Sequence, residues 1–220
     1  LGVFFHGLFF GWQKSLAKAI SSGKKTVWVM WGGDLYNPIK NTVEDISDVV
    51  KGFYGVSTWW DKDYELFQKH YGYKLRVPFK YASEAFCLDK KFIQNKEKTI
   101  ILGNSADPSN NHLDIIDKIL QLKDIKKYSI IIPFSYNIPD GYLNVIENKL
   151  RTVDLQKNTQ LLTKMLPREE YFSLLGRAEI VIMAHDRQQG GSNIYASLFY
   201  GAKVFMKHNI FLTEKIQKTQ

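Results

Sequence analysis

The chain has very little cysteine. Its 220 residues include one cysteine, Cys87, which excludes an internal disulfide and any metal cluster built on cysteine thiolates. This usage is typical of a reducing compartment, and we interpret Cys87 as a small core residue rather than a nucleophile. No run of about 18 apolar residues occurs, so no transmembrane helix is predicted. The apolar start, Leu1–Trp12, also lacks the basic beginning and the cleavage site of a signal peptide.

Internal repeats and low-complexity tracts are absent too, and the chain lacks an initiating Met. Because it opens inside an apolar, strand-like run, we expect further residues before Leu1. The composition is that of a globular protein, with 45% hydrophobic and 24% charged residues. The formal charge of +8 suits a phosphorylated substrate or anionic lipid head groups. The lysines are scattered and no nucleic-acid motif occurs, so no nucleic-acid partner is expected.

Short apolar strands alternate with amphipathic helical segments along the whole chain. This alternation predicts an α/β protein with parallel sheets. The first part reads as strand Gly2–His6, helix Leu8–Ser21 and strand Thr26–Trp31, followed by a glycine turn. Later helices are expected at Thr42–Phe53, from Asp61 or Asp63 to Lys69, Ser109–Leu122, Tyr142–Leu150, Arg168–Gly176 and Ser192–Tyr200. Extended segments are expected at Val77–Tyr81, Thr99–Gly103, Ser129–Phe134, Gln160–Met165, Ile180–Ala184 and Lys203–Met206.

We expect two lobes, residues 1–88 and 98–220. The stretch Cys87–Glu97 is polar, carries three lysines and holds little that would build a core, so it is the predicted boundary. The regular alternation after it predicts a doubly wound parallel sheet.

The segment ILGNSADPSNNH (101–112) ends an apolar strand in a turn of small and polar residues and then opens a helix. A helix N-terminus offers unpaired N–H groups and the positive end of the helix dipole, which favour anions such as diphosphates. This segment is therefore a candidate binding turn.

A second segment, HDRQQGGSN (185–193), also lies between a strand and a helix. Gly190 and Gly191 let backbone N–H groups approach a ligand, and Arg187 can grip a diphosphate or carboxylate with two parallel hydrogen bonds. A plain helix-capping turn would explain the glycines alone, but the Arg-Gln-Gln run favours binding.

Two residues of the first part are candidate bases. Asp34 follows the glycine turn of WGGDLYN (31–37), and His6 ends the first strand. Each has an equally good structural interpretation, a turn cap for Asp34 and a backbone-bonded histidine for His6. The acidic pair of Asp61-Lys62-Asp63 is better read as the start of a helix, with Asp63 as a cap, and no cluster has convincing metal spacing.

The segment Phe9–Lys18 combines aromatic residues with lysines. Leu8, Phe9, Trp12, Leu16, Ala19 and Ile20 share one helical face, with Lys14 and Lys18 off it. A helix that faces the core is the simpler reading, and contact with a membrane interface is the alternative.

The order of these motifs resembles the 4-acetamido-4,6-dideoxygalactose transferase family, glycosyltransferase family 56. The resemblance runs from about Phe4 to Lys207. It rests on the segments HGLF (6–9), WVMWGGDLY (28–36), ILGNSADPSNNH (101–112), IIPFSY (131–136), the helix Glu170–Leu175 and HDRQQGGSNI (185–194). It implies an inverting, metal-independent enzyme of the GT-B type with two Rossmann-like lobes, the first lacking its N-terminal strands. Asn137-Ile138-Pro139 departs from the glycine that the family has after Tyr136.

The resemblance implies a division of roles between the lobes. The first would hold the acceptor, with His6 or Asp34 as base and Gly32, Gly33 and Tyr36 on the acceptor side. The second would bind the nucleotide-sugar through Gly103, Asn104, Ser105, Asn110, Asn111, His112, Tyr136, Arg187, Gln188, Gln189, Gly191 and Asn193. No metal and no further cofactor is expected.

The implied reaction moves a deoxyamino sugar from a dTDP carrier to an undecaprenyl-diphosphate-linked saccharide, in enterobacterial common antigen or a related surface polysaccharide. The implied location is peripheral, on the cytoplasmic face of the bacterial inner membrane. Two other classes stay open: a non-catalytic module that binds a nucleotide or glycan, and an adaptor that binds a lipid surface.

Overall fold

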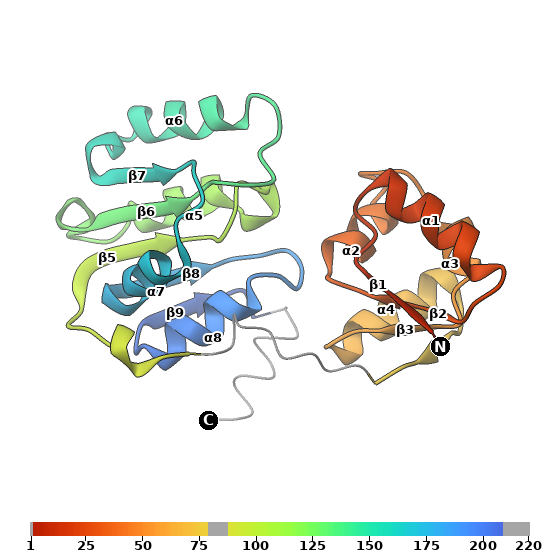
Figure 1. Ribbon diagram of the computed structural model, residues 1–220. Helices are drawn as coiled ribbons and strands as arrows, with labels where there is room; N and C mark the ends of the chain where they lie inside the picture. Colours follow the sequence, from red (N-terminus) through yellow and green to blue (C-terminus); the bar gives the residue numbers. More distant parts are fainter. Residues whose placement is uncertain (1, 79–87, 209–220) are drawn as a thin grey trace. The chain divides into compact units, whose positions relative to one another are not determined.

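The computed structural model describes residues 2–78 and 88–208 of the chain. They belong to two compact units, Leu1–Ala82 and Ser83–Gln220, and each unit contains one parallel sheet (Figure 1). Cys87 and most of the predicted extended segment Val77–Tyr81 lie outside the described residues.

Unit 1 is a four-stranded parallel sheet with the order β1-β2-β3-β4. Its buried centre is Trp28 of β2, whose ring lies 6.3 Å from that of Phe53 and 6.1 Å from that of Phe67. The strands are β1 (Val3–His6), β2 (Thr26–Val29), β3 (Gly55–Ser57) and β4 (Leu75–Arg76), and the helices are α1 (Gly11–Ser21), α2 (Gly33–Ile39), α3 (Ser47–Lys51) and α4 (Asp61–Tyr71).

Three features of unit 1 differ from the prediction. The glycine turn leads directly into α2, because Gly32 adopts a positive φ of 95° and starts the helix. The helix expected over Thr42–Phe53 shortens to α3, since the chain before Ser47 is not helical. The strands β3 and β4 are too short to show an apolar period in the sequence.

The predicted buried face of Leu8–Ser21 is only partly correct: Leu8 is buried and Ile20 packs against the core, but the predicted residues between them do not. Trp12 and Leu16 are 65% and 44% exposed, and Ala17 is the buried residue of the helix. Lys14, predicted to point away from the core, is only 15% exposed in its side chain and pairs with Glu44 at 3.5 Å. The helix packs through Ala17, Ile20 and the stem of Lys14, and its Trp12 faces outward.

Unit 2 is a five-stranded parallel sheet with the order β7-β6-β5-β8-β9. Each strand predicted for this part of the chain is present, within a few residues at its ends. The strands are β5 (Glu97–Leu102), β6 (Ser129–Pro133), β7 (Thr159–Leu162), β8 (Ala178–Met183) and β9 (Lys203–Met206), and the α-helices are α5 (His112–Ile119), α6 (Tyr142–Thr152), α7 (Arg168–Arg177) and α8 (Gly191–Phe199).

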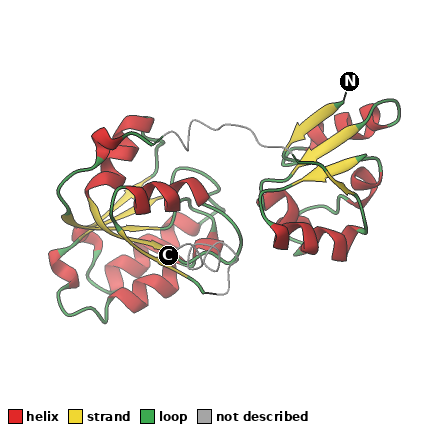
Figure 2. Cartoon of the chain, turned by 90° about the horizontal axis from the view of Figure 1, so that it is seen from below, coloured by secondary structure: helices red, strands yellow, loops and turns green. Residues whose placement is uncertain are grey.

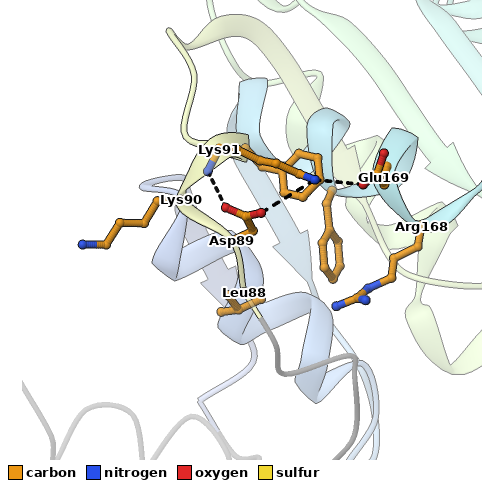
Figure 3. A pocket seen from close by; sticks show the side chains of 8 residues that line it. Leu88, Asp89, Lys90, Lys91, Arg168 and Glu169 are labelled. Atoms are coloured by element: carbon orange, nitrogen blue, oxygen red, sulfur yellow. Dashed lines mark hydrogen bonds and ion pairs between the residues drawn. The ribbon is translucent and has the colours of Figure 1, made fainter.

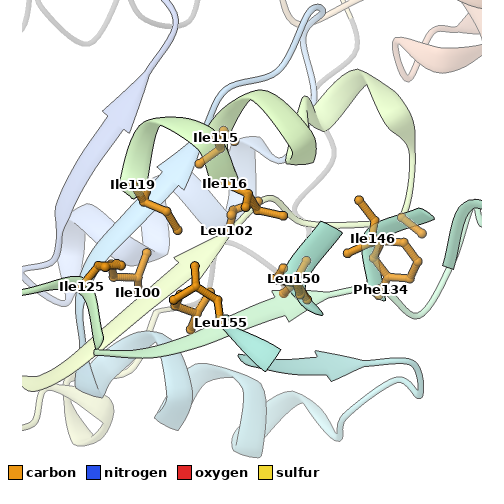
Figure 4. Close-up of a cluster of buried hydrophobic side chains, with 13 residues drawn as sticks. Ile100, Leu102, Ile115, Ile116, Ile119, Ile125, Phe134, Ile146, Leu150 and Leu155 are labelled. Atoms are coloured by element: carbon orange, nitrogen blue, oxygen red, sulfur yellow. The ribbon is translucent and has the colours of Figure 1, made fainter. Parts of the chain in front are cut away.

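Helices cover the unit 2 sheet, as Figure 2 shows. Alternate residues of the strands, including Ile100, Leu102 and Ile132, join Ile116 of α5 and Leu150 of α6 in one apolar cluster (Figure 4). The intervening strand residues Ile101, Ile131, Val181 and Met183 are buried as well. Burial on both faces explains why these strands read as continuous apolar runs.

The predicted polar boundary contributes to the core of unit 2. Its Phe92, in a short 3₁₀ helix (Lys90–Phe92), is 9% exposed and packs edge-on against Phe172 and Tyr200. The segment from residue 88 therefore belongs to unit 2, and the division falls between Ala82 and Ser83. Bonds from Lys91 to Glu169 and from Lys96 to the carbonyls of Gly176 and Tyr200 hold the segment there together with Phe92.

We predict that Gly176→Ala lowers the free energy of unfolding by about 1–3 kcal/mol, measured by chemical denaturation. A Cβ at this position in α7 would lie 1.8 Å from the carbonyl oxygen of Phe92. The matched control is Gly11→Ala at the start of α1, where nothing lies within 4 Å of the added Cβ. Equal effects of the two substitutions would contradict the close packing of α7 against Phe92.

Candidate functional site

The strand order of unit 2 reverses between β5 and β8. From β5 the chain builds β6 and β7 on one side and then returns to place β8 and β9 on the other. In open parallel sheets ligands bind outside the carboxyl ends of the strands at such a switch point. The residues after β5 and after β8 are the two predicted binding segments, and the fold therefore makes them neighbours.

The turn after β5 is built around the side chain of Asn110. Its Oδ1 accepts the N–H of Asn104 at 3.0 Å, and its Nδ2 donates to Ser105 Oγ at 3.2 Å and to the carbonyl of Asp107 at 2.9 Å. Asn110 is fully buried. It therefore holds the turn in shape from inside rather than presenting its amide to a ligand.

Asn111 joins the two segments. Its Nδ2 donates to the carbonyl of Ala184 at 2.7 Å and to Asp186 Oδ1 at 3.0 Å, and the N–H of Asp186 donates to the carbonyl of Ser109 at 3.0 Å. Gln189 Oε1 also accepts the Ser109 hydroxyl at 3.3 Å. These bonds fasten the turn after β8 to the turn after β5.

An ion pair lies within the same region. Arg187 Nη2 donates to Asp107 Oδ2 at 3.0 Å, and the Arg187 side chain is only 8% exposed. Asp107 Oδ1 accepts the N–H of Ser109 at 2.9 Å. Burial opposes ionisation of Asp107, but the bonds from Ser109 and the charge of Arg187 outweigh it and lower the pKa of this carboxyl. Both members of the pair are therefore charged at neutral pH.

Several buried polar atoms of this region have no hydrogen-bond partner within the described residues: Asn104 Oδ1, His185 Nε2, Gln188 Oε1 and Gln189 Nε2. Leaving such an atom unpaired costs roughly 1–3 kcal/mol. Burial lowers the pKa of His185 to about 3, with the charge of Arg187 acting in the same direction. His185 is therefore a neutral hydrogen-bonding group.

The remaining candidates of unit 2 lie around the same edge. Tyr136 follows β6, and its hydroxyl oxygen accepts a hydrogen bond from the Asn104 side-chain amide at 2.8 Å. His112 is fully buried, its Nδ1 lies 3.1 Å from the Tyr142 hydroxyl, and burial lowers its pKa to about 4. Gly103 directly follows β5, while Gly191 and Asn193 begin α8, where the space around Gly191 is open.

In unit 1 the carboxyl ends of β1 and β2 lie side by side. The exposed ring of His6 is 6.4 Å from that of Trp31, which precedes Gly32 and Gly33. Asp34 is 3% exposed and accepts three hydrogen bonds, from the indole N–H of Trp28 at 2.7 Å and from the N–H groups of Trp31 and Leu8 at 2.8 and 3.2 Å. These bonds give Asp34 a structural role, in holding Leu8, Trp28 and Trp31 rather than in capping the following turn, and its role as a base stays a prediction.

Tyr36 donates its hydroxyl hydrogen to Asp63 Oδ1 at 2.6 Å. Asp63, the third residue of α4, is 2% exposed, and its Oδ2 accepts a hydrogen bond from the Thr58 hydroxyl at 3.5 Å. Burial raises the pKa of Asp63 and that of Asp34 to about 6, although hydrogen bonds to both carboxyls oppose the shift. The two buried acids thus organise the carboxyl edge of unit 1.

The structure therefore brings the predicted nucleotide-sugar residues together at one sheet edge. Sequence reasoning missed Asp107 as the partner of Arg187, and it did not single out Ser109 or His185. An acidic residue at the start of a turn is itself a capping signal, which Asp107 fulfils. Nothing in the sequence pairs it with an arginine 80 residues away.

A pocket of about 550 Å³ lies elsewhere on unit 2, near the start of α7 (Figure 3). Its Lys91 bonds Glu169 at 2.8 Å and lies 3.7 Å from Asp89, so the lysine charge is matched by acids. No predicted site residue lines it.

Among residues 2–78 and 88–208, no group of three or more His, Cys, Asp or Glu side chains is placed to hold a metal ion. No helix of that same part is long and apolar enough to cross a bilayer.

The two parallel sheets with their helices define an α/β protein of the GT-B glycosyltransferase type. Similar folds occur in alpha,alpha-trehalose-phosphate synthase from Burkholderia xenovorans (TM-score 0.63, 11% identity, 89% of this chain and 56% of that one). They also occur in a glycosyltransferase from Rickettsia africae ESF-5 (0.61, 14%, 95% and 57%) and in WaaG, a glycosyltransferase involved in lipopolysaccharide biosynthesis (0.60, 12%, 99% and 59%).

A sequence model of the family described as 4-alpha-L-fucosyltransferase, glycosyl transferase group 56, matches residues 49–219. The chain belongs to this family, which agrees with the resemblance seen in its motifs. It spans a little over half the length of the solved structures to which it is similar.

We predict that Asp63→Asn changes the pH dependence of stability. The folded chain keeps a proton on Asp63 up to about pH 6, whereas an unfolded chain releases it near 3.8. The stability that this proton contributes is fully present below the pKa of Asp63 in the unfolded chain. It is lost as the pH rises through the pKa of Asp63 in the folded chain. The free energy of unfolding of the variant relative to wild type should rise by about 2–3 kcal/mol between pH 4 and pH 6. A difference that stays constant over this range would contradict the raised pKa.

Proposed function

We propose that the chain is the greater part of a glycosyltransferase that moves a deoxyamino sugar from a dTDP carrier to a lipid-linked saccharide. Family membership supports the reaction class. The observation that carries the proposal is the joined pair of turns after β5 and β8. They set Arg187, the start of α8 and unpaired buried polar groups at one switch point. The dTDP carrier and the deoxyamino sugar come from the motif resemblance.

The site suits a nucleoside diphosphate as leaving group. As the bond between the anomeric carbon and the phosphate oxygen breaks, negative charge builds on the diphosphate. Arg187 and the N–H groups at the open start of α8 are the candidates to stabilise that charge. This electrostatic route needs no metal ion, in agreement with the proposed metal-independent mechanism.

Inversion at the anomeric carbon requires a base for the acceptor hydroxyl. We assign this role to a residue of unit 1, and we favour His6 over Asp34. His6 is exposed, whereas the Asp34 carboxylate is buried and already accepts three hydrogen bonds. The base takes the hydroxyl proton as the acceptor oxygen attacks, and the nucleoside diphosphate departs from the opposite face.

The proposed acceptor is an undecaprenyl-diphosphate-linked saccharide, met at the cytoplasmic face of the inner membrane. Unit 1 offers features that suit a lipid surface. Phe9, Phe10 and Trp12 are each more than half exposed, and residues 1–33 contain four lysines and no acidic residue. Aromatic residues with flanking lysines are typical of interfacial segments.

We predict that Arg187→Ala lowers the rate of sugar transfer by at least 100-fold. The substitution removes the cation and leaves the Asp107 carboxylate to repel the diphosphate. Transfer from a dTDP-sugar to a polyprenyl-diphosphate saccharide is measured with the full-length protein, and dTDP affinity is measured in parallel. Arg151→Ala, at an exposed position of α6, is the matched control and should keep full activity.

Transfer at the wild-type rate by Arg187→Ala would refute the site. The same assay with His6→Ala tests the alternative of a binding module without catalysis. Loss of transfer with retained dTDP binding is expected of an enzyme base. If wild-type protein binds dTDP but transfers no sugar, the chain is a binding module.

A further inference from the structure

Four of the buried polar atoms of unit 2 that have no partner within the described residues belong to side chains that contact Gly190 or directly precede it, those of Asn104, His185, Gln188 and Gln189. A Cβ built on this residue would lie 2.8 Å from Cε1 of His185 and 3.4 Å from Oδ1 of Asn104, and its φ of +64° also favours glycine. Gln188 and Gln189 precede it in the same turn. Asn104, His185 and Gln188 are each more than nine-tenths buried. The glycine thus brings the main chain of one segment against polar side chains of both.

Most of these atoms are hydrogen-bond acceptors. Asn104 donates its amide hydrogen to Tyr136, which leaves Oδ1 as the unpaired atom. The carbonyl of Gln189 hydrogen-bonds the neutral His185 ring. Because Nε2 is the nitrogen without a partner in the described residues, the proton lies on Nδ1 and Nε2 is an acceptor. Gln188 Oε1 is the third acceptor, and the fourth atom, Gln189 Nε2, is a donor.

A phosphate is a poor partner for this set. Its oxygens accept hydrogen bonds and carry negative charge, so they cannot satisfy carbonyl oxygens or an imidazole lone pair. Sugar hydroxyls and amide groups do satisfy them, because they donate as well as accept. Arg187, which directly precedes Gln188, and the start of α8 at Gly191 provide the cation and the N–H groups that a diphosphate needs.

We propose that Asn104, His185, Gln188 and Gln189 form a subsite that binds the glycosyl group of the nucleotide-sugar through its hydroxyl or amide hydrogens, apart from the diphosphate. The turn lies at the surface, since Gln189, Gly190 and Gly191 are half-buried. Rotation of the two glutamine side chains brings their amides to the ligand. The subsite rests on the proposed function, and it makes these side chains determinants of sugar specificity.

The test compares nucleotide-sugars with their parent nucleotides. Calorimetry gives the Kd of dTDP and dTDP-glucose, and of UDP and UDP-N-acetylglucosamine, for the full-length protein. Gln188→Met removes both polar atoms of the amide while keeping most of the side-chain volume. We expect it to weaken the tighter-binding nucleotide-sugar at least fivefold while changing the Kd of the parent nucleotide less than twofold. Gln121→Met, at an exposed position after α5, should change neither.

Equal weakening of the nucleotide-sugar and of its parent nucleotide by Gln188→Met would place Gln188 at the diphosphate and overturn the proposal. If wild type binds none of the four probes, the proposed nucleotide-sugar function fails and the subsite fails with it.

Discussion

The reversal of strand order between β5 and β8 is the constraint on which the site depends. Each strand of a parallel sheet must be followed by a crossover, and these crossovers are right-handed. The crossover after β5 leads to β6, and the helix after β8 leads to β9 on the other side. The chain consequently leaves β5 toward one side of the sheet and β8 toward the other, and a ligand can bind at the sheet edge between the two turns. The sheet is covered on both faces, since Ile100 and Ile101 point to opposite sides and are both fully buried.

Side-chain hydrogen bonds then divide the polar residues of that edge into two groups. The side-chain amides of Asn110 and Asn111 form hydrogen bonds within and between the two turns. These bonds hold the turns in a fixed shape, which determines where the other side chains can lie. Asn104, Gln188 and Gln189 keep one end of each amide unpaired within the described part of the chain. Arg187 is different again, since the carboxylate of Asp107 positions its guanidinium. A preorganised frame of this kind lowers the entropy that a ligand must lose on binding.

Much of unit 2 could be predicted from the sequence, because each strand is a short apolar run and each helix begins after a polar turn. The two binding segments were recognisable for the same reason. The pairing of Arg187 with Asp107 was not predictable, since it depends on tertiary contact across 80 residues. Periodicity also misled for α1, where Trp12 and Leu16 form an apolar face that points outward while Ala17 packs inward. A pattern shows that a face is apolar, but it does not show what the face contacts.

The central claim is that a nucleotide-sugar binds where the turns after β5 and β8 meet. Hydrogen–deuterium exchange of the full-length protein, with and without a saturating dTDP-sugar, tests this claim directly because it reports on individual segments. Protection of backbone amides in residues 103–112 and 185–193 is the predicted result, since ligand contact slows the opening of both turns. If the ligand binds but protects neither segment, the switch point of unit 2 is not the binding site.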